Sequence, residues 1–362
     1  MAGPLLDARG LCKTFSSGRG GSRRTVRAVQ DVDISIGAGE TLGLVGESGS
    51  GKTTTGRILL RLVEPDEGGA TFRGEDLLAL EGSELRQMRR HIQLIYQDPF
   101  SSVDPRFRAR DIVAEPWVIH GLYDRAERRR RADQLLQRVG IDPALGDRRP
   151  ASFSGGQLQR IGIARALALE PSLIVCDEPV SALDVSVQGQ ILNLLMDLQQ
   201  ERGVSYLFIA HDLGVVRHIS DRVSVMYAGR IVETGTRDEV FGAASHPYTQ
   251  ALLAAMGRAD GPAATAEPAT SGEPPTGCSF RGRCQRAQER CAEAVPELIE
   301  RGQGHPVACY FAEPEAAPSA ADSRVHGDDS DVGKQVDDRD EQAGDDPDAD
   351  DERRIEAPQP QQ

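Results

Sequence analysis

The segment that most constrains this chain is residues 46–53, GESGSGKT, which match the phosphate-binding pattern G-x-x-x-x-G-K-[ST]. The apolar run at 40–45 before it predicts a buried strand, and apolar residues at helical spacing after it predict a helix over 54–63. A strand, a glycine-rich turn and a helix N-terminus surround phosphates with backbone N–H groups and the positive end of a helix dipole. The sequence therefore predicts an α/β fold with a nucleoside-triphosphate site, in which Lys52 faces the β- and γ-phosphates and Thr53 holds Mg²⁺. The residues expected around the phosphates are Gly46, Glu47, Ser48, Gly49, Ser50, Gly51, Lys52, Thr53 and Thr54.

A second motif, LIVCDE at residues 173–178, is an apolar run that ends in two carboxylates. It predicts a buried parallel strand, and ligands of open α/β sheets bind at the carboxyl ends of such strands. We expect Asp177 to hold Mg²⁺ through water and Glu178 to polarise the water that attacks the γ-phosphate. A purely structural pair of carboxylates is the alternative, which the nearby phosphate loop disfavours.

Several polar residues stand at the ends of other predicted elements. Gln97 follows a strand expected at 92–96, and His211 follows a strand expected at 206–210. The sequence SGGQ at 154–157 begins a helix expected to run to 168, where small residues at a helix start form a seat for an anion. Phe15, near the end of a strand expected at 5–15, is a candidate for simple packing or for stacking on an adenine ring.

In this order and spacing, the motifs resemble the ATP-binding subunit of an ABC transporter over residues 5–256. The resemblance implies a P-loop NTPase cassette with a RecA-like core, an antiparallel β-subdomain and a helical subdomain, which binds ATP and Mg²⁺. It also implies a dimer in which each subunit completes the other's site. By this resemblance, Phe15 is the platform on which the adenine stacks, Gln97 senses the γ-phosphate and Mg²⁺, and His211 contacts the γ-phosphate. Asp184 belongs to the loop that crosses the dimer interface. The signature motif that closes on ATP bound by the opposite subunit consists of Ser154, Gly155, Gly156 and Gln157.

Two further segments resemble oligopeptide/dipeptide importers, namely residues 97–106 (QDPFSSVDPR) and 246–253 (HPYTQALL). The resemblance implies an ATPase that powers peptide import, at the cytoplasmic face of the cell membrane. Its expected partners are a different second ATPase subunit, two permeases and an external solute-binding protein. Carriers of nickel and of sugars share this resemblance, so they remain alternative cargo classes. We expect the turn-rich segment after Gln97, including Phe100 and Val103, to meet a permease.

A soluble ABC ATPase acting in translation or DNA maintenance is the alternative from another class. Such proteins usually carry two fused cassettes or a long coiled-coil insertion, whereas this chain has one cassette. The chain has no apolar run of about 18–20 residues and no basic, apolar signal at its start, so we expect it to be intracellular. Its net charge is −14, but residues 322–362 contain 15 acidic against 5 basic residues. The remainder is close to neutral, which does not favour nucleic-acid binding.

The end of the chain divides by composition. Residues 257–276 are rich in Ala, Pro, Gly and Thr and predict a linker. Residues 277–312 predict a small cysteine-rich C-terminal domain. Residues 313–362 are acidic, with almost no large apolar side chains, and predict a disordered tail.

Four cysteines, Cys278, Cys284, Cys291 and Cys309, lie within 32 residues in a short, aromatic-poor segment that could hardly fold on a core of its own. A cytosolic compartment disfavours disulfides, which leaves either tetrahedral zinc or a [4Fe–4S] cluster. A similar cysteine pattern in peptide-importer ATPases implies an iron–sulfur cluster in some members, so the resemblance favours [4Fe–4S], with zinc and then an empty site as alternatives. Cys12 and Cys176 fall in or near predicted strands and are expected to be inert buried thiols.

Overall fold

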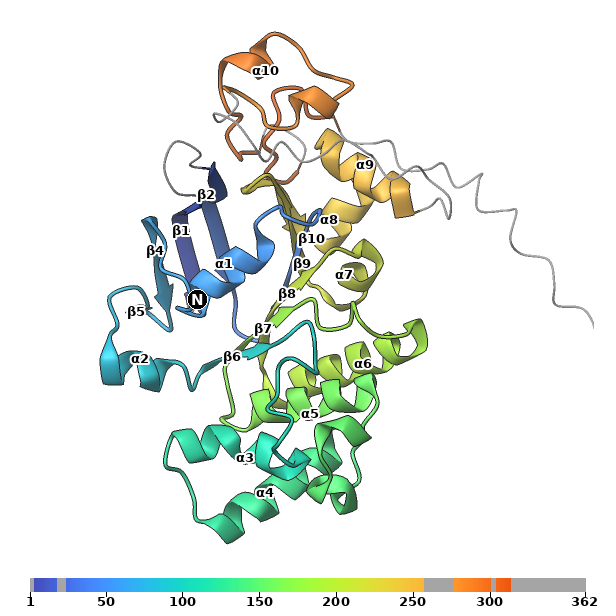
Figure 1. The fold of residues 1–362 in the computed structure, drawn as a ribbon. Coiled ribbons are helices and arrows are strands. Elements are labelled where there is room, and N and C mark those ends of the chain that lie inside the picture. Colours follow the sequence, from blue (N-terminus) through green and yellow to red (C-terminus); the bar gives the residue numbers. More distant parts are fainter. Residues whose placement is uncertain (1–2, 18–23, 257–275, 301–303, 314–362) are drawn as a thin grey trace, which may run out of the picture. The chain divides into compact units, whose positions relative to one another are not determined.

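The computed structural model describes residues 3–17, 24–256, 276–300 and 304–313. Within these ranges the chain forms a four-stranded antiparallel sheet and a six-stranded, mostly parallel sheet with helices around them (Figure 1). The predicted linker lies outside the described residues except for Thr276, and so does the predicted acidic tail except for Glu313. None of the helices in the described ranges has the length and apolar character needed to cross a bilayer.

The antiparallel sheet has the strand order β2-β1-β4-β5. In β2, Val32, Ile34 and Ile36 are buried while Asp33 is exposed, which is the alternation typical of a strand with one face on a core. The predicted strand at 5–15 and the antiparallel β-subdomain are therefore confirmed. The strands of this sheet are β1 (Leu6–Ser17), β2 (Arg24–Ile36), β4 (Glu67–Phe72) and β5 (Glu75–Asp76).

The larger sheet has the strand order β10-β9-β3-β8-β7-β6, and only β10 runs antiparallel to its neighbour. In register, Val45 pairs with Ala210, and Asp177 pairs with Ile209. The carboxyl ends of β3, β7 and β8 therefore meet at one edge, which gathers the motifs that follow them. The strands are β3 (Thr41–Val45), β6 (Ile92–Ile95), β7 (Leu173–Asp177), β8 (Ser205–Ala210), β9 (Arg222–Tyr227) and β10 (Arg230–Thr236).

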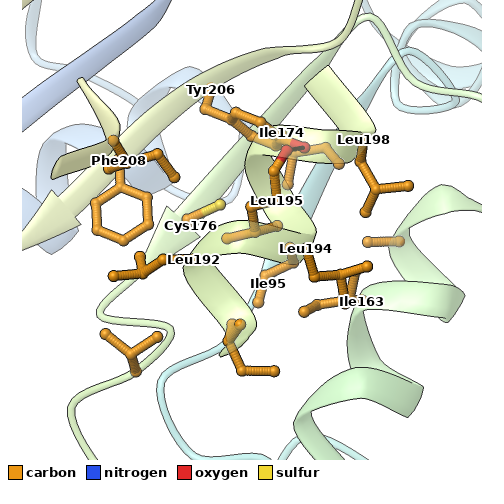
Figure 2. Close-up of a cluster of buried hydrophobic side chains, with 14 of the residues drawn as sticks. Ile95, Ile163, Ile174, Cys176, Leu192, Leu194, Leu195, Leu198, Tyr206 and Phe208 are labelled. Carbon is orange, nitrogen blue, oxygen red and sulfur yellow. Dashed lines mark hydrogen bonds between the residues drawn. The ribbon is translucent and has the colours of Figure 1, made fainter. Parts of the chain in front are cut away.

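The central strands are buried on both faces, as expected of parallel strands covered by helices. Ile174 and Cys176 of β7 belong to one apolar cluster, whereas Leu173 and Val175 belong to the other. Figure 2 shows the first cluster, where side chains of β7 and β8 meet leucines of α6 (Val185–Arg202) and Ile163 of α5 (Gly155–Leu167).

The two cassette cysteines differ in their surroundings. Cys176 is fully buried, and burial raises the pKa of its thiol, which confirms the expected inert group. Cys12 in β1 is only half-buried, and its sulfur accepts a hydrogen bond from the Asp31 N–H at 3.3 Å.

The stretch before the SGGQ motif is mostly helical, but it is not one continuous helix. The chain instead forms α3 (Ala109–Ile119) and α4 (Arg125–Arg138). Gly121 and Tyr123 adopt φ values of 65° and 59°, which end the first helix, and Asp124 begins the second by accepting a hydrogen bond from the Glu127 N–H at 2.8 Å. The other elements before β7 are α1 (Lys52–Leu59), α2 (Gly82–Met88), η1 (Pro143–Asp147) and η2 (Pro150–Ser152).

We call residues 276–300 and 304–313 the cysteine-rich segment. Phe280 of this segment is buried within the same apolar cluster as the larger sheet. Residues 306–308 lie along the outer edge of β10, because the Thr234 N–H donates to Pro306 O at 3.1 Å and the Ala308 N–H to Val232 O at 2.8 Å. The segment is thus packed onto the cassette. The elements after β8 include α7 (Leu213–Ile219), α8 (Arg237–Gly242), α9 (Pro247–Met256), η3 (Arg281–Arg283) and α10 (Arg290–Glu293).

Candidate functional site

The phosphate-binding loop connects β3 to α1 through two positions that only glycine fits. Gly46 has φ 155°, and a Cβ there would lie 2.1 Å from Met226 O. Gly51 has φ 109°, and its Cβ would lie 2.1 Å from Ala28 O. The loop therefore packs closely against the neighbouring backbone, and a larger residue at either position would clash with that backbone.

Lys52 is a buried cation at the start of α1. Its Nζ donates hydrogen bonds to Gly46 O at 2.7 Å and to Glu47 O at 2.8 Å. Burial lowers the pKa of Lys52, while the charges of Glu178, Asp177 and Glu47 act in the opposite direction. The loop thus holds one positive charge close to three carboxylates.

Two of the three residues expected at Mg²⁺, Thr53 and Asp177, are brought together. The Thr53 hydroxyl donates a hydrogen bond to Oδ1 of Asp177 at 2.8 Å, across 124 positions of sequence. Burial raises the pKa of Asp177, and the hydrogen bond from Thr53 opposes this shift. A hydroxyl beside a carboxylate supplies the oxygen donors that Mg²⁺ prefers, so this pair fits the ion.

Three sequence-predicted residues converge at the end of β7. Nε2 of Gln97 donates to Oε2 of Glu178 at 2.8 Å, and Nδ1 of His211 lies 3.2 Å from the same oxygen. Glu178 has φ 49°, a left-handed conformation that is strained for a residue with a side chain. Its N–H donates to Ile209 O at 2.9 Å, which holds this backbone in place. These contacts hold the Glu178 carboxylate between the Gln97 amide and the His211 imidazole.

A cavity of about 440 Å³ lies beside these groups. Its lining joins the phosphate loop to the β7 and β8 ends, and it includes Leu252 of α9, which the sequence analysis did not predict as a site residue. The lining residues are Gly46, Glu47, Ser48, Glu178, His211 and Leu252.

Among the described residues, those that line this cavity include no member of the SGGQ motif. Ser154 caps α5 by accepting a hydrogen bond from the Gln157 N–H at 3.3 Å, and the Gln157 side chain accepts one from the Ser154 N–H at 3.0 Å. Both side chains are exposed. Asp184 is also exposed, and Val185 beside it is 84% exposed, which is unusual for an apolar side chain. These residues therefore face outward rather than into the chain's own cavity.

Phe15 and the segment after Gln97 also present apolar surface. Phe15 is 43% exposed, with Nζ of Lys13 lying 5.8 Å from its ring centroid. Phe100 is 53% exposed, and a Cβ at Gly155 would lie 3.9 Å from its ring. Val103 is only 7% exposed and packs in the apolar cluster, so its expected place on the permease-facing surface is wrong.

Two residues beyond β10 contact the phosphate loop, and the sequence analysis missed both contacts. The Tyr248 hydroxyl accepts a hydrogen bond from the Glu47 N–H at 2.8 Å. The Arg283 guanidinium forms two hydrogen bonds with the Glu47 carboxylate, at 2.8 and 2.9 Å. The HPY motif was visible in the sequence, whereas nothing local to Arg283 points to a partner 236 positions away.

The clustered cysteines lie close enough together for three of them to affect the pKa of the fourth, Cys309. Burial raises the pKa of Cys309 to about 11, and the charges of Cys278, Cys284 and Cys291 act in the same direction. However, no group of three or more His, Cys, Asp or Glu side chains within the described ranges is arranged to hold a metal ion. The side-chain arrangement therefore does not fit the predicted metal centre, which needs four thiolates directed at one ion or cluster.

Comparison with known proteins matches two parts of the chain to family models. Residues 29–181 match the model described as ABC transporter, and residues 232–291 match the model of the oligopeptide/dipeptide transporter C-terminal region. The chain is 48% identical over 334 residues to the probable peptide ABC transporter ATP-binding protein y4tS of Sinorhizobium fredii, which covers 90% of this chain and 95% of that protein. It is 47% identical over 319 residues to the oligopeptide transport ATP-binding protein AppF of Bacillus subtilis, covering 85% and 97%.

The fold is similar to two solved structures. One is the dimeric ATP-binding cassette MJ0796 in a post-hydrolysis state bound to ADP and Pi, with a TM-score of 0.58 and 30% identity over 64% of this chain and 99% of that chain. The other is cbiO1 from Clostridium perfringens, part of an ABC transporter complex, with a TM-score of 0.58 and 27% identity over 66% of this chain and 91% of that chain.

Proposed function

This chain belongs to the ATP-binding proteins of ABC transporters, in the oligopeptide/dipeptide group, and on that premise we propose that it hydrolyses ATP to power peptide import through membrane permeases. The observation that carries the proposal is the convergence of Gln97 and His211 on one oxygen of Glu178. This cluster lies beside the hydrogen-bonded pair of Thr53 and Asp177. These contacts support Glu178 as the proposed base beside the phosphate loop.

In the proposed mechanism, the residues of this chain divide the work. Lys52 and the N–H groups at the start of α1 bind the phosphates. Thr53 and Asp177, together with Gln97, would hold Mg²⁺, and the ion would neutralise charge on the phosphates. Glu178 accepts a proton from the attacking water, while Gln97 and His211 orient its carboxylate. Phe15 supplies an exposed aromatic ring on which the adenine stacks.

We propose that the catalytic site is completed by a second ATPase subunit. The support is the outward exposure of Ser154, Gln157, Asp184 and Val185, which leaves the SGGQ motif free to contact nucleotide on another subunit. Ser154 and Gln157 cap each other and so keep the helix start rigid for an anion. A different, related chain is the proposed partner, which makes the assembly a heterodimer.

The remaining partners follow from peptide import as a membrane process. The proposed assembly includes two permeases and an external solute-binding protein, and this chain would lie at the cytoplasmic face of the cell membrane. Residues 98–106 are the proposed contact with a permease. Phe100 supports this role because its side chain is half exposed and its ring lies near Gly155 of the SGGQ motif.

A separate and finer proposal concerns the cysteines. We propose an iron–sulfur cluster, with zinc as the alternative, held by Cys278, Cys284, Cys291 and Cys309. The spacing of the cysteines in the sequence supports it, whereas the arrangement of ligand side chains described above does not.

The experiment that tests the ATPase proposal uses Glu178→Gln in the assembled transporter. The amide keeps the shape of the side chain but cannot accept the proton, so we expect ATP binding to persist and turnover to fall at least about a hundredfold. Glu170→Gln, which makes the same change at a residue outside the site, is the matched control. Hydrolysis by Glu178→Gln at the wild-type rate would remove Glu178 from the catalytic role.

A further inference from the structure

Glu47, the second residue of the phosphate loop, is held from two directions by residues that follow the larger sheet. Its N–H donates to the Tyr248 hydroxyl of α9 at 2.8 Å. Its two carboxylate oxygens accept from Nη1 and Nη2 of Arg283 at 2.9 and 2.8 Å, which is a bidentate pair. One loop residue is therefore fixed at its backbone and at its side chain.

The Arg283 guanidinium is held in an aromatic setting. Its central carbon lies 5.8 Å from the Tyr227 ring centroid and 5.6 Å from the Phe280 ring centroid. The Arg283 side chain is only 16% exposed. Tyr227, Tyr248 and Phe280 also pack on one another, with ring centroids 4.6 to 5.5 Å apart. The pair is therefore part of a packed interface between the cysteine-rich segment and the cassette, unlike a solvent-exposed ion pair.

The Glu47 carboxylate lies where it affects the charge balance of the phosphate site. Glu47 lines the cavity that also contains Glu178 and His211. Its charge acts on Lys52, the cation that faces the phosphates, and its carbonyl accepts a hydrogen bond from Lys52 Nζ. An unpaired carboxylate here would repel the negative charges of ATP, and the repulsion would grow with the number of phosphates.

We propose that Arg283 is a positioning residue for ATP binding, which neutralises Glu47 and fixes the phosphate loop, so that the cysteine-rich segment sets the affinity of the site for nucleotide phosphates. This inference rests on the proposed ATPase function. Removing Arg283 leaves the Glu47 charge uncompensated beside the phosphates. Removing both groups restores a neutral environment at that position.

The test measures dissociation constants for ATP and ADP with the full-length chain at fixed salt. For Arg283→Ala we expect the ATP constant to rise about tenfold, the effect of losing one charge-assisted pair, and the ADP constant to rise less. Glu47→Gln combined with Arg283→Ala should return ATP affinity to that of Glu47→Gln alone. Arg283→Lys keeps the charge without the bidentate geometry and should give an intermediate value.

Arg281→Ala is the matched control, because it removes the same charge from the same 3₁₀ turn, where Arg281 contacts the Thr276 carbonyl instead of the phosphate loop. It should leave both constants unchanged. A purely structural role for Arg283 predicts equal losses for ATP and ADP and no recovery when Glu47 is neutralised, and that result would overturn the inference. So would wild-type ATP affinity in Arg283→Ala. If Arg283→Ala does not fold, Arg283→Gln, which retains a long polar side chain, is measured by the same criteria. Failure of the wild-type chain to bind ATP would count against the proposed function itself.

Discussion

The Thr53 hydroxyl and the Asp177 carboxylate are joined by a hydrogen bond of 2.8 Å that links the start of α1 to the carboxyl end of β7. The bond holds a carboxylate whose pKa is raised by burial and sets its orientation toward the phosphate loop. The two groups proposed to hold Mg²⁺ are thus positioned on rigid elements, and each can be varied while the other is kept.

Asp177→Asn should weaken the binding of Mg²⁺ without a large change in the shape of the side chain. The amide accepts the Thr53 hydrogen bond but lacks the negative charge that attracts the ion. We expect the Mg²⁺ concentration for half-maximal ATPase activity to rise about tenfold or more, measured by titration at saturating ATP. Thr53→Ser keeps the hydroxyl and should remain near wild type. An unaltered Mg²⁺ titration for Asp177→Asn would show that Asp177 is not part of the metal site.

Lys52→Ala should lose ATP affinity by at least about tenfold, because it removes the cation that we propose binds the phosphates. Lys52 also donates to two carbonyls of the loop, so thermal unfolding must be measured alongside binding. A variant that remains folded and binds ATP as tightly as the wild-type chain would refute the role of the phosphate loop.

Phe100 and Val103 should respond to substitution in opposite ways. Phe100→Ser changes an exposed side chain, so we expect the melting temperature to hold while peptide-stimulated ATPase activity of the assembled transporter declines. Val103→Ala removes two methyl groups from the core and should lower the free energy of unfolding by roughly 1–3 kcal/mol. Full coupling in Phe100→Ser would mean that the permease contact lies elsewhere.

Metal analysis of anaerobically purified protein decides the cysteine proposal. An iron–sulfur centre predicts iron and acid-labile sulfide that are lost in Cys284→Ser and retained in Cys12→Ser, since Cys12 lies in β1 away from the cluster in sequence. One zinc per chain with the same dependence would assign the site to zinc. Protein free of both metals would remove the proposal and agree with the described arrangement of ligand side chains.

The local motifs were predictable from the sequence because their geometry is set by short-range chemistry. The glycines at 46 and 51, and the carboxylates at the end of β7, sit where the pattern predicted. The parallel register then brings Gln97, Glu178 and His211 together, as the strand ends implied. These parts depend on the strand and turn signals of a few neighbouring residues each.

The missed features depend on distant contacts or on single backbone conformations. The break between α3 and α4 depends on positive φ at Gly121 and Tyr123, and these are single backbone conformations that a helical pattern does not reveal. The burial of Val103 depends on helices that fold over its loop. The pairing of Arg283 with Glu47 spans 236 positions, and the neighbouring cysteines suggest metal binding rather than an ion pair with the phosphate loop.

The strip of residues 306–308 along β10 has a consequence for how the protein is made. On the ribosome, β10 emerges before residues 306–308 exist, and until then its outer N–H and C=O groups are an open template for another strand. Nascent chains that stall between β10 and the cysteine-rich segment would therefore expose a sheet edge that can pair with another strand, and we expect chaperones to bind them. In the folded chain, residues 306–308 cover the outer edge of β10 and so protect it from edge-to-edge aggregation.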